Sequence, residues 1–441
     1  MTITEFGRAL RAGETTSEQM TEACLAHIAA RSDLNAFILV MADEALRRAR
    51  DADRELAGGR DLGPLHGVPM SIKDLMDVQG TPTTAASRVR TAQPAAADAP
   101  AIANLRAAGA VFVGKTNLHE YALGTTSEDS AFGAVRNPID PGRSAGGSSG
   151  GSAVSIVAGM AFASVGTDTG GSIRIPASAC GIVGLKPSYG EVSTGGVIAL
   201  SPRLDHVGPL AKSVADAWTV FRALAGEPRP APVPPAQPSG VRLRVLRQYF
   251  CDFLDDDVRQ RFDEALRRFA ASGMRVDESV IEHADTIVSV YQRIAPREAF
   301  LQHAATLDTV PERYTAAVRQ RLEIGRTVPL EDFARALEDQ AVLRAEVDAA
   351  LAGGDALVLP TLPIPAPRLG ADIVAVGATE QPTRAMMLRD TQLFNLTGHP
   401  AISLPCGLTR DGLPCGLQIV GARDQTAQLI RVALACEALL S

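Results

Sequence analysis

Apolar positions near the N-terminus recur at the spacing of α-helices. In "SEQMTEACLAHIAARS", Leu25 and Ile28 recur at helical spacing. Thr15 followed by Glu18 fits a capping box, so we expect an amphipathic helix to begin here. A second helix is expected at about 42–56, where Ala, Arg and acidic residues dominate.

Shorter apolar runs bounded by turn residues predict buried strands. We expect strands at 68–72 and at 111–113, the second following a turn at Gly109. Alternation of helices and strands continues to Leu210, which indicates an α/β protein with a mixed or mainly parallel sheet. Late in the chain, "HPAISLPCG" and "LPCGLQIVG" look like strands joined by the turn "TRDG".

A proline-rich stretch, "EPRPAPVPPAQPSG", is the strongest break in composition, because its prolines forbid a helix or a central strand. It divides the chain into four parts: residues 1–225, a connector at 226–240, a region of charged amphipathic helices at 241–354, and a last part at 355–441. The last part begins with a buried strand and continues in a loop at 361–384 that is poor in regular signals. That loop is a candidate lid.

Composition and charge fit a globular protein and argue against a main role in nucleic-acid binding. Hydrophobic residues make up 46% and charged residues 21% of the 441, and 43 basic against 50 acidic residues give a net charge of −7. No signal peptide is visible, and the apolar run at 153–165 is too short to cross a bilayer. Six cysteines without a C-x-x-C pair and seven histidines without metal-ligand spacing are typical of a cytoplasmic protein with no metal site.

The stretch "GAVFVGKT" at 109–116 matches the G-x-x-x-x-G-K-[ST] phosphate-loop pattern. In a phosphate loop the middle residues must curl so that their N–H groups converge on the phosphates. Here the middle residues, 110–113, are apolar and partly β-branched, which favours a strand. We therefore interpret this stretch as a strand rather than a nucleotide site.

Two overlapping G-x-S-x-G patterns surround Ser148 and Ser149 and match a nucleophile elbow. In such an elbow the serine follows a strand, and an acid and a histidine come later; His206 or His399 would satisfy that order. The preceding segment, "NPIDPGRSA", is a loop rather than a strand. The elbow is therefore the weaker alternative for the serines.

A third pattern combines residues that are ordinary one by one. Lys73 follows an apolar run, and a buried lysine has a lowered pKa that lets it act as a base. Ser148 and Ser172 each follow paired glycines. Behind Ser172 the chain is able to enter a helix, a setting that suits attack on a carbonyl and capture of the resulting oxyanion.

In the motifs that contain Lys73, Ser148 and Ser172, the chain resembles the amidase signature family. The matching stretches include "GPLHGVPMSIKD", "GGSSGGSAVSIVAG", "GTDTGGSIRIPASACGIVGLKPSYG", "LDHVGPLAKSV" and "FNLTGHPAISLPCG". They cover most of 1–225 and about 355–441, whereas 240–350 contains no matching motif. The resemblance implies one amidase-signature domain over 1–441, an α/β fold with a large mixed sheet flanked by helices on both faces.

The resemblance also implies a Ser–cis-Ser–Lys triad. By motif position, Ser172 is the nucleophile, Ser148 the bridging serine and Lys73 the base, with a cis peptide after Gly147. Neutral Lys73 would take a proton from Ser148, which takes one from Ser172. No metal or cofactor is expected.

Other residues of the same motifs receive supporting roles. The resemblance implies an oxyanion hole built from four backbone N–H groups, those of Thr169, Gly170, Gly171 and Ser172. Asp168 and Arg174 are expected to shape the nucleophile loop rather than to touch substrate. Ser149 is expected to satisfy local backbone groups, and Ile175 to favour an apolar acyl or aryl group.

We expect a free-standing amidase that cleaves carboxamides, and aryl amides, carbamates or esters by the same machinery. The alternative is the glutaminase subunit of a tRNA-dependent amidotransferase, in which a glutamine usually stands where this chain has Ile175. A small-molecule amide or carbamate is the expected partner, without nucleic acid or membrane. A homodimer is common among relatives, although nothing in the sequence fixes one.

Overall fold

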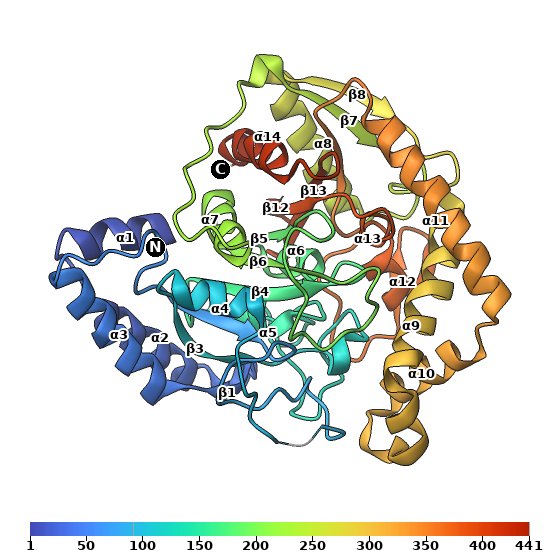
Figure 1. Ribbon diagram of the computed structural model, residues 1–441. Helices are drawn as coiled ribbons and strands as arrows, with labels where there is room; N and C mark the ends of the chain where they lie inside the picture. The colour runs from blue at the N-terminus through green and yellow to red at the C-terminus, as the bar shows by residue number, and fades with distance from the viewer. Residues whose placement is uncertain (91, 441) are drawn as a thin grey trace.

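The computed structural model describes residues 1–90 and 92–440, in which eleven strands form one mixed sheet (Figure 1). In spatial order these strands are β1 (Phe37–Val40), β3 (Val111–Thr116), β2 (Pro69–Lys73), β4 (Ala163–Asp168), β6 (His206–Ala211), β5 (Val183–Lys186), β12 (Ala401–Leu408), β13 (Pro414–Val420), β9 (Ala356–Pro360), β7 (Arg242–Leu246) and β8 (Arg275–Ser279). Parallel pairs occur towards both ends of the sheet, and its centre is antiparallel. The expected mixed sheet is confirmed.

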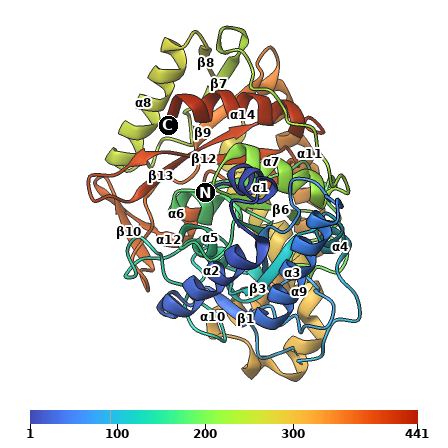
Figure 2. The same ribbon diagram turned by 90° about the vertical axis from the view of Figure 1, so that its left-hand side faces the viewer.

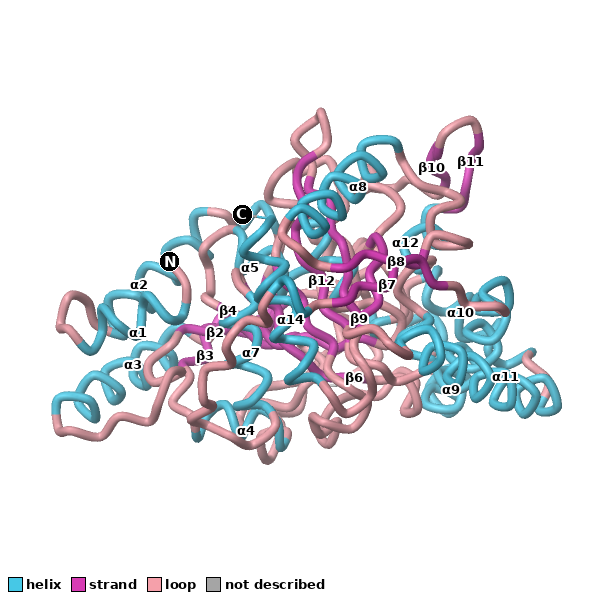
Figure 3. The backbone as a smooth tube through the Cα atoms, turned by 90° about the horizontal axis from the view of Figure 1, so that it is seen from above, coloured by secondary structure: helices cyan, strands magenta, loops and turns pink. Residues whose placement is uncertain are grey.

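Helices pack on both faces of this sheet (Figure 3). The α-helices of the described chain, not all of which touch the sheet, are α1 (Ile3–Arg11), α2 (Ser17–Ala30), α3 (Ala42–Ala57), α4 (Pro100–Ala107), α5 (Gly150–Val157), α6 (Arg174–Cys180), α7 (Val214–Leu224), α8 (Asp256–Ala271), α9 (Ile287–Thr309), α10 (Ala316–Thr327), α11 (Leu330–Leu351), α12 (Thr383–Leu388), α13 (Leu393–Leu396) and α14 (Thr426–Leu440). Helices α9, α10 and α11 pack together at one end of the molecule (Figure 1), while α14 lies beside α8 (Figure 2).

Several local predictions are confirmed. The expected strands at 68–72 and 111–113 are β2 and β3, and the expected helix at 42–56 is α3. The phosphate-loop pattern therefore lies on a strand, and its Lys115 forms a buried ion pair with Asp74 at 2.6 Å. In the connector, the only helical or strand element is a short 3-10 turn at Pro238–Gly240.

The predicted capping box is wrong by one residue. Helix α2 is capped by Thr16, whose hydroxyl accepts from the N–H of Gln19 at 3.1 Å while the Gln19 side chain accepts from the N–H of Thr16. Thr15 and Thr16 are adjacent, and each has a suitable partner three residues later. Sequence alone therefore did not separate the two registers.

Several strands in the second half of the chain were not predicted, among them β8 and a hairpin. Strand β8 lies within the region expected to be helical, and its residues are largely exposed, so no apolar run marks it. The 361–384 loop contains a hairpin, β10 (Ile373–Val376) paired with β11 (Thr379–Pro382), and the start of α12. The prediction of a loop without regular structure is corrected.

No helix in the described part of the chain is long and apolar enough to cross a membrane. The six cysteines are all free thiols.

Candidate active site

Three chain segments meet at one edge of the sheet. Lys73 is the last residue of β2 and Asp168 the last residue of β4. Because β2 and β4 are parallel neighbours, their carboxyl ends lie side by side. The segment after β4 turns through Ser172 into α6, and Ser149 stands immediately before α5. The N–H of Ser149 donates to the carbonyl oxygen of Ser172 at 3.2 Å, which joins the two serine-bearing segments.

Lys73 is fully buried among hydroxyl groups. Its Nζ donates three hydrogen bonds: to Ser148 Oγ at 2.7 Å, to Ser149 Oγ at 2.8 Å and to Thr167 Oγ1 at 2.7 Å. Burial lowers the pKa of Lys73 to about 7, and the negative charges of Asp168 and Asp205 oppose that shift only in part. A substantial fraction of this amine is therefore neutral near pH 7 and able to accept a proton.

Thr167 was not among the residues singled out from the sequence. It sits next to Asp168 on β4, and its role as a partner of Lys73 depends on the pairing of β4 with β2. That pairing is a long-range property which the local sequence does not carry.

Ser148 is held by its backbone as well as by its side chain. The peptide between Gly147 and Ser148 is cis, as the resemblance implies. The carbonyl oxygen of Ser148 accepts hydrogen bonds from the Ser127 hydroxyl and from the N–H of His119, both at 3.1 Å. A side chain at Gly147 would collide with the backbone at Thr125–Ser127, so only glycine fits there.

The three residues of the expected triad differ in their exposure to solvent. Lys73 and Ser148 are 0% exposed, whereas Ser172 is 6% exposed and lines a cavity of about 30 Å³. Among the residues described, no hydrogen bond joins the Ser148 and Ser172 hydroxyls. The structure therefore joins Lys73 to Ser148 by a hydrogen bond, and no described hydrogen bond continues from the Ser148 hydroxyl to the Ser172 hydroxyl.

The alternative elbow serines do not meet the requirements of that motif. Ser148 and Ser149 are both 0% exposed. His206 Nδ1 lies 2.7 Å from the Leu204 carbonyl oxygen, and His399 Nε2 lies 3.0 Å from Asp348 Oδ1. Neither histidine ring bonds a serine in the described structure, so the serine–histidine arrangement is not formed.

The backbone around Ser172 presents several free donors. In the described chain, the N–H groups of Thr169, Gly170 and Ser172 have no acceptor, which suits an oxyanion. The N–H of Gly171 instead donates to Asp168 Oδ1 at 2.8 Å, so the expectation that Gly171 contributes to the oxyanion hole is revised. A Cβ at Gly170 would collide with the Tyr291 hydroxyl, which explains the glycine.

A buried ion pair braces this turn. Arg174 Nη2 lies 2.9 Å from Asp168 Oδ1, and both side chains are 0% exposed. Burial alone would raise the pKa of Asp168, but the charge and hydrogen bonds of Arg174 hold it well below its usual range. Arg174 also donates to Asn395 Oδ1 at 2.7 Å and to Gln418 Oε1 at 3.0 Å. Neither member of the pair lines the cavity, as expected for residues that shape the loop.

Asp205 is a second residue that the sequence reasoning missed. The hydroxyl of Thr169 donates to Asp205 Oδ1 at 2.6 Å, which fixes the start of the turn. Burial raises the pKa of Asp205 to about 6. Asp205 lies in "LDHVGPLAKSV", one of the motifs that carried the resemblance, so its motif was recognised but its contact was not.

Besides the turn that carries Ser172 and the side chain of Leu200, the cavity is lined by the 122–125 segment, helix α9 and helix α12. Helix α9 contributes Tyr291, Ala295 and Pro296, and helix α12 contributes Arg384 and Leu388. Helix α9, in the region of charged helices at 241–354, thus forms part of the cavity wall. Ile175 does not line it; the side chain is 0% exposed and packs with Leu362, Ile364 and Met386. The inference of an apolar pocket from Ile175 is therefore corrected.

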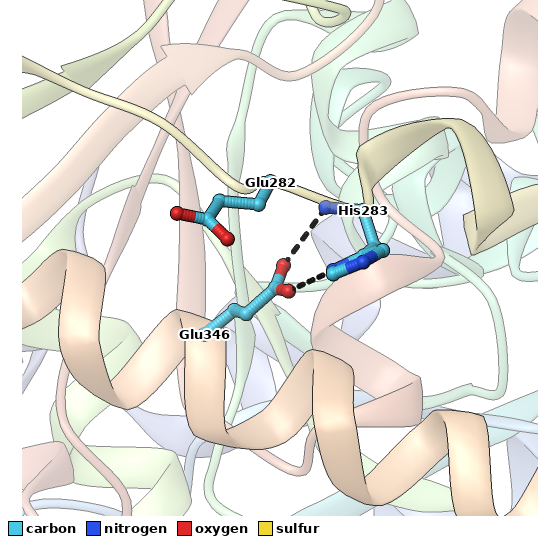
Figure 4. Close-up of side chains that lie close together, drawn as sticks. All are labelled: Glu282, His283 and Glu346. Carbon is cyan, nitrogen blue, oxygen red and sulfur yellow. Dashed lines mark hydrogen bonds and ion pairs between the residues drawn. The ribbon is translucent and has the colours of Figure 1, made fainter.

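A cluster of possible metal ligands lies on the surface, formed by Glu282, His283 and Glu346 (Figure 4). Their ligand atoms lie within 4.8 Å of one another. His283 forms an ion pair with Glu346, which also accepts from the His283 backbone N–H at 3.1 Å. This surface ion pair accounts for the arrangement.

Comparison with known proteins places the chain among amidases. A protein-family model described as Amidase matches residues 19–430. A relative from Koribacter versatilis (strain Ellin345), one of the subunits of its glutamyl-tRNA(Gln) amidotransferase, is 36% identical over 477 residues, covering 99% of this chain and 98% of the relative.

Solved structures agree in fold along the whole chain. The crystal structure of an amidase matches with a TM-score of 0.95 and 38% identity over 100% of both chains. A structure described as a vestigial protein complex that reveals the evolutionary origins of an s-triazine catabolic enzyme matches with a TM-score of 0.92 and 34% identity, covering 100% of this chain and 98% of the other. With its buried Ser–Ser–Lys cluster and a family match over nearly its full length, the chain belongs to the amidase signature family.

Proposed function

We propose that this protein is a free-standing amidase that hydrolyses carboxamide C–N bonds through an acyl-enzyme on Ser172. One observation carries the proposal: Lys73 Nζ lies 2.7 Å from Ser148 Oγ, and of these three residues only Ser172 reaches the cavity. The arrangement supplies a buried base, a bridging hydroxyl and a reachable nucleophile.

The reaction begins with proton transfer. Neutral Lys73 takes a proton from Ser148, which takes one from Ser172 as the two hydroxyls come within hydrogen-bonding distance. The Ser172 oxygen then bonds to the carbonyl carbon, and the free N–H groups of Thr169, Gly170 and Ser172 bind the oxyanion.

Collapse of this adduct breaks the C–N bond. The leaving nitrogen takes the proton back through Ser148, so ammonia or an amine departs and an ester to Ser172 remains. Water, deprotonated by the same relay, attacks the ester carbonyl and releases the carboxylic acid. Aryl amides, carbamates and esters present the same carbonyl to Ser172 and fall within the proposed range.

The glutaminase subunit of an amidotransferase is the second candidate, favoured by the name of the 36% identical relative. A free-standing enzyme is favoured by the 38% identical amidase structure, which matches over the full length of both chains. Activity without a partner protein distinguishes the two candidates.

Ser172→Ala tests the proposed nucleophile. The panel comprises primary amides, anilides, aryl carbamates, esters and glutamine, assayed with the purified protein alone. We expect wild-type turnover and a loss of at least about 10³-fold in Ser172→Ala, because loss of the attacking group removes the covalent route. Ser148→Ala is expected to be severely impaired while remaining folded.

Ser178→Ala is a matched control, since Ser178 is buried on α6 and does not line the cavity. Retained turnover in folded Ser172→Ala would refute the mechanism. Turnover of glutamine alone, or only with added partner protein, would move the assignment to the amidotransferase subunit.

A further inference from the structure

The cavity beside Ser172 carries one positive charge. Its titratable side chains are Arg384 on α12 and Tyr291 on α9, and no Asp or Glu belongs to the described lining. The remaining wall is backbone, small residues and aliphatic groups such as Leu123 and Leu200. A ligand in this space therefore meets a cation that has no acidic side chain beside it in the described lining.

Arg384 differs from the other arginines near the site in its partners. Arg174 pairs with Asp168 at 2.9 Å, and Arg321 lies 3.6 Å from Asp129. In the described chain Arg384 forms no ion pair, and its one hydrogen bond goes to the Leu123 carbonyl oxygen at 3.5 Å. A guanidinium has five N–H donors, so most of those on Arg384 remain available.

The charge on Arg384 persists at neutral pH. Burial, and then the nearby positive charge of Arg321, lower the pKa of Arg384 to about 10, still above physiological pH. A partly buried cation without a partner is unfavourable, and an anion bound beside it relieves that cost.

Tyr291 supplies a neutral donor in the same wall. Burial raises the pKa of Tyr291 to about 12, so its hydroxyl keeps its proton. The hydroxyl lies against Gly170 in the nucleophile turn and has no hydrogen-bond partner among the described residues. Both Tyr291 and Arg384 line the same cavity as Ser172.

We propose that the substrate is an amide whose acyl chain bears a carboxylate, which binds between the Arg384 guanidinium and the Tyr291 hydroxyl. The inference rests on the proposed amidase function and specifies its substrate class. A planar carboxylate matches the paired donors of a guanidinium. Glutamine carries an ammonium group as well, which would find no acidic partner in the described lining, so a monoanionic amide fits better than a zwitterion.

The cavity of about 30 Å³ has room for roughly one water molecule, so substrate entry requires side chains to move. The test substrates therefore differ in the length of the acyl chain between the amide and the carboxylate. The substrates are malonamate, succinamate and glutaramate, with 4-methylpentanamide as a neutral analogue that replaces the succinamate carboxylate by an isopropyl group. Glutamine is compared with glutaramate, from which it differs by its amino group.

We expect kcat/KM for the best carboxylated amide to exceed that of the neutral analogue by about 100-fold, the range for hydrogen bonds to a charged group. Arg384→Met is expected to reduce this preference to about threefold or less, and Arg384→Lys to restore part of it. Tyr291→Phe is expected to lower the preference for the carboxylated amide over the neutral analogue by about tenfold. Arg389→Met is the matched control, because Arg389 adjoins α12 but stacks on Tyr249 and does not line the cavity.

Binding is measured separately from turnover. Calorimetry of the Ser172→Ala protein with succinate or glutarate should show binding that weakens at least about tenfold when Arg384→Met is added. Arg384-dependent binding without cleavage of any amide would support the anion site and refute the proposed function. Equal use of neutral and carboxylated amides, a preference retained in Arg384→Met, or faster turnover of glutamine than of glutaramate would overturn the inference.

Discussion

Three lysines are fully buried in this protein, and their partners give them different chemistry. Lys115 pairs with the Asp74 carboxylate at 2.6 Å, which favours its charged form. Lys186 donates to the His399 carbonyl oxygen at 2.6 Å, an acceptor that has no proton to give. Lys115 also donates to the Thr83 hydroxyl at 2.9 Å, but Lys73 is the one of these three whose described partners are all hydroxyl groups, which both accept from an ammonium and donate to an amine. Its partners therefore permit proton transfer.

The lowered pKa of Lys73 predicts a pH profile. Because the neutral amine is the base, kcat/KM should rise with pH through about 7 and then level off. Lys73→Met should lose at least about 10³-fold and show no such rise, because the titrating base is gone. Steady-state kinetics from roughly pH 5 to pH 9, a range that ends below the pKa of about 10.4 of a free lysine, would reveal this rise. A rate that is still increasing steeply at the upper end of this range would contradict the prediction.

Thr167→Val should shift the same pH profile of kcat/KM, because Thr167 is a hydrogen-bond partner of Lys73. Valine removes one acceptor from the Lys73 ammonium, so the charged form loses stabilisation and the pKa falls. The rise in kcat/KM should move to lower pH. A purely structural role for Thr167 would lower activity without moving the profile.

The sequence predicted part of this residue-scale picture. The apolar run before Lys73 indicated burial, and the motifs identified Ser148 and Ser172. Thr167 and Asp205 were missed because their contacts depend on which strands and turns lie side by side. Ile175 was misjudged because its position next to the nucleophile turn says nothing about which way it packs.

At the scale of elements, the turn between β4 and α6 is braced from the far end of the chain. Arg174 on α6 joins Asp168 at the end of β4 to Asn395 on α13 and Gln418 on β13. Local sequence could identify the turn but not the braces, which come from more than two hundred residues away (for Asn395 a separation of 221).

Removing one member of the buried ion pair should destabilise the fold. Arg174→Met leaves the Asp168 carboxylate buried without its counter-ion, which costs about 3–5 kcal/mol. The Asp168→Asn, Arg174→Met double variant removes both charges and should recover part of the loss. Urea denaturation of the three proteins provides the measurement, and an Arg174→Met variant as stable as the wild type would refute the role.

Elements were predicted best where apolar patterning is strong. Strands β2 and β3 and helix α3 lie within a few residues of their expected bounds. Strand β8 and the β10–β11 hairpin are largely exposed, so their sequences lack the apolar pattern that marks a buried strand. Strand β8 pairs with β7, and β10 and β11 pair with each other in a separate two-stranded sheet.

At the scale of the whole molecule, the sheet interleaves segments from both ends of the chain. Strands β12 and β13 lie between β5 and β9, so the central antiparallel part is built from early and late residues together. The sequence break at the proline-rich connector does not separate two sheets.

Truncation should therefore abolish cooperative folding. A chain of residues 1–354 lacks β9, β12 and β13, which leaves β5 without a partner on one side and β7 without its link to the sheet. We expect no sharp thermal transition by circular dichroism, in contrast to the full chain. A cooperative, native-like transition in the truncated chain would contradict this account.

The brace from Gln418 to Arg174 also has a consequence during protein synthesis. Ribosomes add about 5–20 residues per second, and Ser172 emerges long before Gln418 does. Until β13 is made, the turn that carries Ser172 lacks one of its supports. The nascent chain should therefore stay inactive towards the amides of the cell until translation is almost complete.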